Sequence, residues 1–369
     1  SIKYHTIKLG FYMIILFLSC AGMHVLPPPS AVEAITPDSE PLAPFEARKP
    51  NTESMNTEYY VGSEADELAQ FELFGQQMQA MQDQNSIAYE QPIQRGVHDK
   101  SHGCFEGDLV LREDRDARTR YGVFADQYTD WPVWVRLSNG VGHTQADSVL
   151  DVRGFAMKLM GVSGVKMMDD EQETQDFLFV STPSSAGKNA EEFMGVVDAG
   201  MRGKGALLRY AFGKPRTVLA PITRAKGVDS MISAQYWSGA AFHLCAHQAV
   251  KMTVKSCEPY ENSPDKSNPD YLRVDLVKAI ESDICFTFYV QLQVDPKRTP
   301  IENASVVWET EISPEIPVAD VYLRKQDFDN SVRDEFCESL SFNPWHGISA
   351  HQPMGNQNRA RRYIYNASQ

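Results

Sequence analysis

The chain has 369 residues and a formal net charge of −14, with 42% hydrophobic and 23% charged residues, so it can bury a sizeable core. Its isoelectric point of about 5.1 argues against nucleic acid as a partner, because proteins that bind phosphate backbones usually carry a basic face. Composition therefore favours a protein that acts on a small molecule, built as one large domain or two smaller ones.

The first 34 residues have the pattern of an export signal. Two lysines precede an uncharged apolar run, residues 9–23, and small residues follow where a signal peptidase would cut, at Val32-Glu33-Ala34. A retained anchor is the alternative, although about 20 residues are needed to span a bilayer, and Cys20 also permits a lipoprotein. We expect residues 1–34 to be a signal peptide or membrane anchor, the protein to be exported, and membrane contact only if this segment is retained.

The rest of the chain divides by composition into a linker and one domain. Residues 35–63 are rich in Pro, Ser and Glu and lack apolar periodicity, which is typical of a linker. Residues 64–369 form the expected folded domain. Five cysteines follow residue 34, and none belongs to a CxxC motif, so a zinc ribbon and a thioredoxin motif are excluded. Their odd number leaves at least one thiol unpaired.

The spacing of apolar residues predicts helices and strands in alternating groups. Helical periodicity occurs at residues 68–81, 190–201 and 331–340. Alternating or continuous apolar runs predict strands at residues 133–140, 151–161, 176–181, 249–256, 285–294 and 304–312. This order of elements indicates an α+β fold with an antiparallel sheet or barrel.

Two pairs of histidines are spaced four residues apart, His98 with His102 and His243 with His247. On a helix each pair would share one face and could bind a metal ion. Neither pair has the glutamate of an HExxH motif, which argues against a zinc protease. We expect His243 and His247 to be structural, since a metal-dependent hydrolase would need a carboxylate ligand that the sequence does not locate.

Two charged stretches need no ligand to explain them. Residues 169–176 contain five carboxylates without the spacing or the glycine of an EF-hand, and we expect a solvated loop. Residues 200–226 contain seven basic residues and no acidic one. A solvated basic face is the expectation there, and docking of an acidic lipid head or a fatty-acid carboxylate is the alternative.

Three short motifs carry the strongest functional signal: Arg95-Gly-Val-His98, Val135-Arg-Leu-Ser138 and Asp151-Val-Arg-Gly-Phe-Ala-Met-Lys158. Arg136 and Ser138 share one face of their predicted strand, where an inward-pointing arginine needs an anion. In order and spacing these motifs resemble the haem catalase superfamily. The resemblance runs from about residue 95 to residue 365 and implies an antiparallel β-barrel core of catalase type with flanking helices.

The C-terminal Arg361-Arg362-Tyr363-Ile364-Tyr365 segment extends the resemblance, since catalases bind the iron through a tyrosine four residues after an arginine. The resemblance implies Tyr365 as the metal ligand of a haem b cofactor, with Arg361 beside it. A free phenol has a pKa of about 10, so binding as phenolate needs a cation, and residues four apart on a helix are neighbours. Tyr363 would face elsewhere. A basic surface helix is the alternative.

The remaining site residues follow from the resemblance position by position. His98 would stand over the iron and transfer a proton between the two peroxide oxygens, and Ser138 would orient it. Arg95 and Arg136 resemble the arginines that pair with haem propionates, and Val97 belongs to the same cofactor-binding motif. Phe193 is the candidate aromatic side chain lining the haem pocket, with an ordinary core residue as the alternative.

One departure concerns the substrate. Catalases carry asparagine over the haem, whereas Val180 and Ser181 stand at the aligned positions here. Small relatives include allene oxide synthases, which rearrange fatty-acid hydroperoxides. The resemblance therefore implies a haem-dependent oxidoreductase for hydrogen peroxide or organic (lipid) hydroperoxides, protective against oxidative stress and compatible with a homo-oligomer. A fatty-acid hydroperoxide isomerase and a non-catalytic haem-binding protein are the alternatives.

Overall fold

The computed structural model describes residues 55–368 except 91, 203, 216, 218–226 and 246–247. The signal or anchor expected in residues 1–34 lies outside the described residues, as does most of the linker expected in residues 35–63. No helix within the described part of the chain combines the length and the apolar character needed to cross a bilayer.

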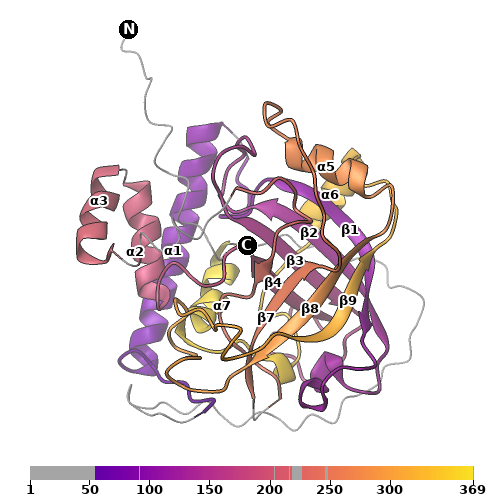
Figure 1. The fold of residues 1–369 in the computed structure, drawn as a ribbon. Helices are drawn as coiled ribbons and strands as arrows, with labels where there is room; N and C mark the ends of the chain where they lie inside the picture. Colours follow the sequence, from indigo (N-terminus) through magenta and orange to yellow (C-terminus); the bar gives the residue numbers. More distant parts are fainter. Residues whose placement is uncertain are drawn as a thin grey trace.

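An antiparallel β-barrel forms the centre of the molecule (Figure 1). Its strands follow the order β5-β4-β3-β2-β1-β9-β8-β7, and a β5–β7 pairing closes the ring, while β6 pairs with β7 beside it. The strands are β1 (Ser101–Leu111), β2 (Asp130–Asn139), β3 (Arg153–Met160), β4 (Thr174–Val180), β5 (Tyr236–Trp237), β6 (Phe242–His243), β7 (Ala249–Ser256), β8 (Ile284–Leu292) and β9 (Ile316–Leu323). The predicted α+β barrel is confirmed.

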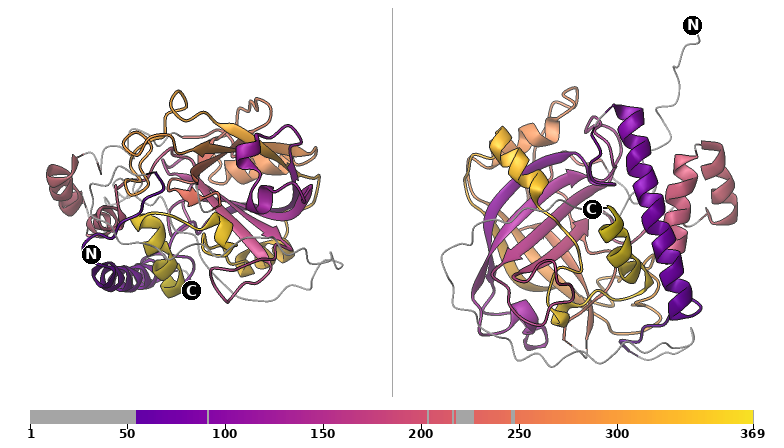
Figure 2. Two further views of the ribbon diagram at one scale, coloured as in Figure 1. Left: turned by 90° about the horizontal axis from the view of Figure 1, so that it is seen from below. Right: turned by 180° about the vertical axis from the view of Figure 1, so that it is seen from behind.

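Helices flank the barrel and do not enter it. Figure 2 shows α1 and α7 side by side along one side of the barrel, with the α2–α3 pair next to α1. The helices are α1 (Glu64–Tyr89), α2 (Ala190–Met201), α3 (Lys204–Gly213), α5 (Tyr271–Ala279), α6 (Ser331–Ser339) and α7 (Asn356–Ser368). The helices predicted at residues 68–81, 190–201 and 331–340 are therefore confirmed as α1, α2 and α6.

Local signals set where α1 begins. The Ser63 hydroxyl accepts a hydrogen bond from the Asp66 backbone N–H, and the Asp66 carboxylate accepts one from the Ser63 N–H. This capping box satisfies backbone donors that have no partner inside the helix. Residues 55–63, which the composition grouped with the linker, pack against the domain: the Gly355 N–H donates to the Glu58 carboxylate, and the Asn56 N–H donates to Gln293 Oε1.

Buried ion pairs connect the two long helices. The Arg359 guanidinium of α7 lies 2.9 Å from a Glu67 oxygen of α1 and 3.0 Å from a Glu58 oxygen. Glu302 is a third carboxylate on the same guanidinium. Because Arg359 can donate up to five hydrogen bonds in fixed directions, it holds three separate segments together.

The strands have two unlike faces. The inner faces of β2, β3 and β4 carry apolar side chains that fill the barrel, among them Leu137, Phe155 and Phe177. The outer faces of the same strands pack against a second apolar cluster that includes residues of α1, α2, α6 and α7. This second layer, between barrel and helices, is where the predicted site residues lie.

One predicted strand is wrong. Residues 304–312 form turns instead, with the Val306 N–H donating to the Asn303 carbonyl and the Ile312 N–H to the Glu309 carbonyl. Trp308 packs into a small separate apolar cluster, so alternation here reflects local burial without a partner strand. Conversely, β1 and β9 were not predicted, although both complete the ring.

Candidate active site

A small cavity lies on the outer face of β2, β3 and β4. The strand register places two rows of side chains along it, Ser138–Gly154–Val180 and Arg136–Ala156–Leu178. The remaining residues at the cavity are His98, Phe155, Phe179, Phe342, Arg361 and Tyr365, of which Phe155 and Phe179 direct their rings into the barrel. The cavity therefore unites the predicted histidine and tyrosine, which lie at opposite ends of the domain sequence.

His98 is held in place by its backbone and by Ser138. Its N–H donates to the Gly140 carbonyl at 2.9 Å, and its Nδ1 lies 3.1 Å from Ser138 Oγ. Its φ of 57° is in the left-handed region, which non-glycine residues adopt mainly where the surroundings enforce it. Opposite lies Gly154, where a Cβ atom would come within 2.5 Å of His98 Nδ1. The glycine is required for this close approach.

Burial, reinforced by the nearby Arg136 cation, lowers the pKa of His98 to about 3. The imidazole is therefore neutral at pH 7 and can accept a proton. Since Nδ1 is the atom that contacts Ser138, the hydrogen bond leaves Nε2 for a ligand in the cavity. Which ring nitrogen carries the hydrogen depends on whether Ser138 donates or accepts.

Tyr365 and Arg361 form the second half of the cavity wall. Both lie on α7, and Arg361 Nη2 donates to Tyr365 Oη at 3.0 Å, as their spacing predicts. Arg361 Nη1 donates to Asn358 Oδ1 at 3.0 Å, which fixes the guanidinium from the other side. Tyr363 points away from the cavity: it is 36% exposed and its ring packs on Phe71.

Arg95 and Arg136 share an acidic partner that the sequence did not reveal. The Glu338 carboxylate of α6 accepts from Arg136 Nη2 at 3.2 Å and pairs with Arg95 Nη1. Arg95 also donates to the Leu340 carbonyl at 3.0 Å, and Arg136 donates to the His98 carbonyl at 2.8 Å. Although burial opposes it, the two guanidinium groups hold the pKa of Glu338 below its usual value. The anion that the strand pattern required is thus supplied by the protein itself.

Val97 and Phe193 lie beside the cavity without lining it. Both are buried in the apolar cluster that also contains Tyr365, and Phe193 projects from α2. Of the two residues aligned with asparagines, Val180 faces the cavity. Ser181 is turned toward β3, where its hydroxyl accepts from the Arg153 N–H at 2.8 Å.

The other histidine positions do not form the pairs considered from spacing. His98 precedes β1 and His102 lies in it, so the two do not share a helical face. His102 Nε2 lies 2.8 Å from Asn139 Oδ1, a buried structural contact. His243 is in β6, and His247 lies outside the described residues.

A buried charge cluster continues the outer face past the cavity. The next row in the register is Trp134–Lys158–Asp176, and Lys158 Nζ lies 2.8 Å from an Asp176 oxygen. Although burial opposes it, hydrogen bonds to Asp170 and Asp176 raise the pKa of His346 to about 9. The acidic stretch 169–176 is therefore not a wholly solvated loop, because its last residue is fully buried and Asp170 pairs with His346.

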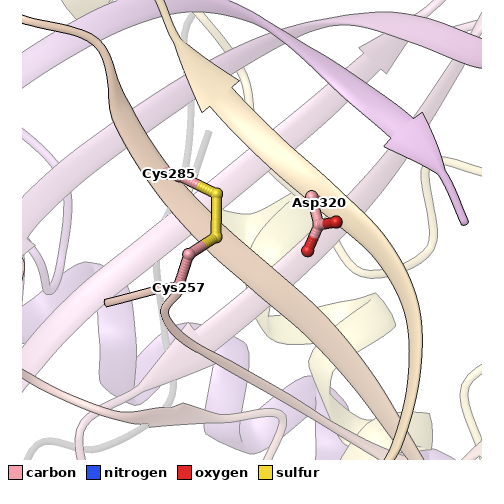
Figure 3. Close-up of side chains that lie close together, drawn as sticks. All are labelled: Cys257, Cys285 and Asp320. Atoms are coloured by element: carbon pink, nitrogen blue, oxygen red, sulfur yellow. A yellow bond between two sulfur atoms is a disulfide. The ribbon is translucent and has the colours of Figure 1, made fainter. Parts of the chain in front are cut away.

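One disulfide, Cys257–Cys285, joins the end of β7 to the start of β8, with Asp320 of β9 close by (Figure 3). Cys104, Cys245 and Cys337 are free thiols. Thr287 Oγ1 donates to Asp320 Oδ1 at 2.7 Å, and Arg112 pairs with the other oxygen. The carboxylate near the disulfide is thus engaged by the protein.

Catalases are among the solved structures with the same arrangement. A fungal catalase superposes with a TM-score of 0.61 at 17% identity, over 88% of this chain and 65% of the other. A bacterial catalase gives 0.58 at 18% identity, over 87% and 63%. Catalase A from Saccharomyces cerevisiae gives 0.59 at 18% identity, over 86% and 67%. The barrel with its outer helices is therefore the catalase fold, and the chain spans about two thirds of the length of these proteins.

The catalase family model matches residues 64–169, the segment that carries the motifs around His98, Ser138 and Gly154. A search among curated proteins finds no match. The family match over residues 64–169 and the fold of the whole domain thus point to the same family of proteins. The matched segment ends before α7, so the role of Tyr365 is not part of that match.

Proposed function

We propose that this protein is a haem-dependent oxidoreductase that acts on hydroperoxides. The observation that carries the proposal is one cavity lined both by a neutral, oriented histidine, His98, and by a tyrosine bonded to an arginine, Tyr365 with Arg361. These are the two functions that peroxide chemistry at a haem needs, a proton carrier and an anionic iron ligand.

The residues present fit haem b. Tyr365 Oη is the candidate iron ligand, and the Arg361 guanidinium 3.0 Å away favours its ionised form. Arg95 and Arg136 together with Glu338 leave one net positive charge at the cavity edge, which favours a propionate carboxylate. Bound haem would supply the metal centre at which the peroxide is held and its redox chemistry occurs.

The protein's own residues would manage the proton. The neutral His98 imidazole would accept the hydrogen of one peroxide oxygen and return it to the other, so that the leaving group would be water or an alcohol. Ser138 holds the imidazole through Nδ1 at 3.1 Å, which aims the other nitrogen at the cavity. Gly154 makes room for this pair.

Organic hydroperoxides are the favoured substrate class. Val180 stands where an amide would hold hydrogen peroxide, and Leu178 and Phe342 make the surrounding wall apolar. Apolar walls disfavour a small polar peroxide relative to one with an alkyl chain. The same walls favour a fatty-acid hydroperoxide isomerase over a non-catalytic haem carrier as the second candidate. Export and self-association remain part of this proposal.

The test of the proposal is a matched pair of tyrosine variants on α7. Tyr365→Phe should lose or greatly loosen haem and its ferric absorption spectrum, whereas Tyr363→Phe should retain both, because Tyr363 points away from the cavity. Wild-type protein reconstituted with haem should then consume an organic hydroperoxide. Equal haem content in the two variants would remove Tyr365 from the ligand role, and haem binding without peroxide turnover would favour a carrier.

A further inference from the structure

Two buried cysteines lie beside the arginine cluster. Cys104 of β1 pairs directly with Arg136 of β2, so its side chain belongs to the same outer face as the cavity row Arg136–Ala156–Leu178. Cys337 lies on α6, which covers this end of the face. Both side chains are 1% exposed. The tertiary structure thus brings together two thiols from distant parts of the chain.

The two thiols interact electrostatically and stand in a cationic environment, and Cys337 Sγ lies 3.9 Å from Oγ of Ser101, at the start of the strand that carries Cys104. Burial and the proximity of Cys337 raise the pKa of the Cys104 thiol. Although burial opposes it, the interaction with Cys104 and the Arg136 and Arg95 cations lower the pKa of Cys337. The two thiols therefore differ in acidity, with Cys337 as the better nucleophile.

We propose that Cys337 and Cys104 form a reversible dithiol–disulfide centre that is oxidised by the hydroperoxides entering the cavity. The Cys337 thiolate attacks the terminal oxygen of the hydroperoxide, the O–O bond breaks, and the alkoxide leaves as an alcohol after taking a proton. The Cys104 sulfur then attacks the Cys337 sulfenic acid, forms the S–S bond and releases water. Two thiols and one hydroperoxide thus yield one disulfide, one alcohol and one water.

The route to the thiols follows from the register. Arg136 lines the cavity and lies between it and Cys104 on adjacent strands, so a molecule in the cavity is one side chain away from the pair. Formation of the disulfide would also affect the neighbouring cluster of Arg95, Arg136 and Glu338. The Cys337 carbonyl accepts a hydrogen bond from Arg95, and Glu338 follows directly. A disulfide would therefore fasten α6, and with it the Glu338 carboxylate, to β1.

The other cysteines provide controls for thiol oxidation within the same chain. Cys257 and Cys285 are already a disulfide, and Cys245 is a partly exposed free thiol at the far side of the barrel from Cys104 in the sheet order. Cys245 forms no disulfide and is not part of the Cys104–Cys337 pair. A peroxide effect specific to Cys337 and Cys104 is thus distinguishable from general thiol oxidation.

The experiment uses the full chain, reduced under mild conditions and then exposed to cumene hydroperoxide before peptide mapping without reductant. We expect a cross-linked Cys104–Cys337 peptide, in wild type and in Cys245→Ser alike, and its disappearance after thiol reduction. Recovery of both residues as thiols after exposure to excess hydroperoxide, or their conversion to sulfinic acid without a cross-link, would overturn the proposal.

Single serine variants test the order of the two steps. In Cys104→Ser the reaction should stop at a sulfenic acid on Cys337, which dimedone traps, whereas Cys337→Ser should leave Cys104 as a thiol. Labelling of Cys104 in place of Cys337 would reverse the assignment and contradict the proposal. The inference rests on the proposed function only for the substrate class, because the cross-link is read by mass and needs no haem turnover. A protein without haem activity that still forms it would refute only the proposed function.

Discussion

The inner and outer faces of strands β2, β3 and β4 have opposite characters although they belong to the same residues in alternation. Inside the barrel, Phe155, Phe177 and Phe179 meet further aromatic rings, with the Phe177 and Phe288 centroids 5.3 Å apart. Outside, the same strands present Arg136, Ser138 and Lys158. The period of two that defines a strand separates these two sets of side chains.

The difference shows how this fold accommodates chemistry without weakening its core. Apolar side chains inside the barrel bury surface and fix the strands. The buried Arg153, which alternates onto this face at the start of β3, donates to the Asp147 carbonyl at 2.7 Å. On the outer face, buried charges are tolerated because each has a partner, such as Glu338 for Arg136 and Asp176 for Lys158. Stability resides mainly on one face and reactivity on the other.

Substitution of neighbouring residues on β4 that face opposite sides of the sheet tests most directly whether the two faces differ in packing. Phe177→Ala should lower the free energy of unfolding by about 3–5 kcal/mol, because it leaves a void among packed rings. Leu178→Ala should cost about 2 kcal/mol, since that side chain already borders a cavity. Chemical denaturation measures both. Equal costs would mean that the outer face is packed as tightly as the inner one.

The buried cluster around His346 should make stability depend on pH. The folded-state pKa of about 9 lies above the usual 6.5, so the stabilisation is fully present below about pH 6.5 and is lost as pH rises through about 9. Protonation of His346 therefore contributes about 3 kcal/mol to the free energy of unfolding below about pH 6.5. Thermal melts of wild type and His346→Gln from pH 6 to pH 10 should converge at the alkaline end.

Lys166, in the same region, changes stability with pH in the opposite direction to His346. Burial lowers its pKa to about 8, so the penalty for holding it charged diminishes as pH rises through that value. Because wild type and His346→Gln both contain Lys166, the difference between their melting temperatures at each pH reports the contribution of His346. A constant difference across the whole pH range would show that His346 is not protonated in the folded state.

On the reactive side, His98→Ala should retain haem and lower hydroperoxide turnover about 100-fold, the usual scale of a general acid–base contribution. His102→Ala is the matched control, with turnover per bound haem close to wild type, since His102 contacts Asn139 away from the cavity. Because the pKa of His98 is near 3, its protonation should leave turnover flat between pH 5 and pH 8. A full-rate His98 variant would refute its role.

The smallest expected effect concerns Val180. Val180→Asn should raise oxygen release from hydrogen peroxide by a few fold, about 1 kcal/mol, because an amide can donate a hydrogen bond that valine cannot. Turnover of an organic hydroperoxide should fall or stay level. Ser181→Asn is the control, because that side chain is turned toward Arg153. If wild type already releases oxygen rapidly and the asparagine adds nothing, the valine has no bearing on substrate choice.

The amino-acid sequence by itself determined the elements whose signals are local. Apolar spacing located α1, α2 and α6, and alternation located most strands, because each pattern reflects one face buried along one element. The Arg361–Tyr365 contact follows from helical geometry alone, four residues apart on α7. The alternation of Arg136 and Ser138 likewise required only that residues 133–140 form a strand.

Only the tertiary structure decided which distant groups meet. Glu338 as partner of Arg95 and Arg136, the Cys104–Cys337 pair and the His346 cluster join residues far apart in sequence, and no local pattern encodes such partners. The same reason explains why residues 304–312 form turns: apolar and polar residues alternate there, but no neighbouring strand pairs with the segment. A strand exists only with its ladder of hydrogen bonds, and a buried charge persists only with its counter-charge, so both depend on the whole fold.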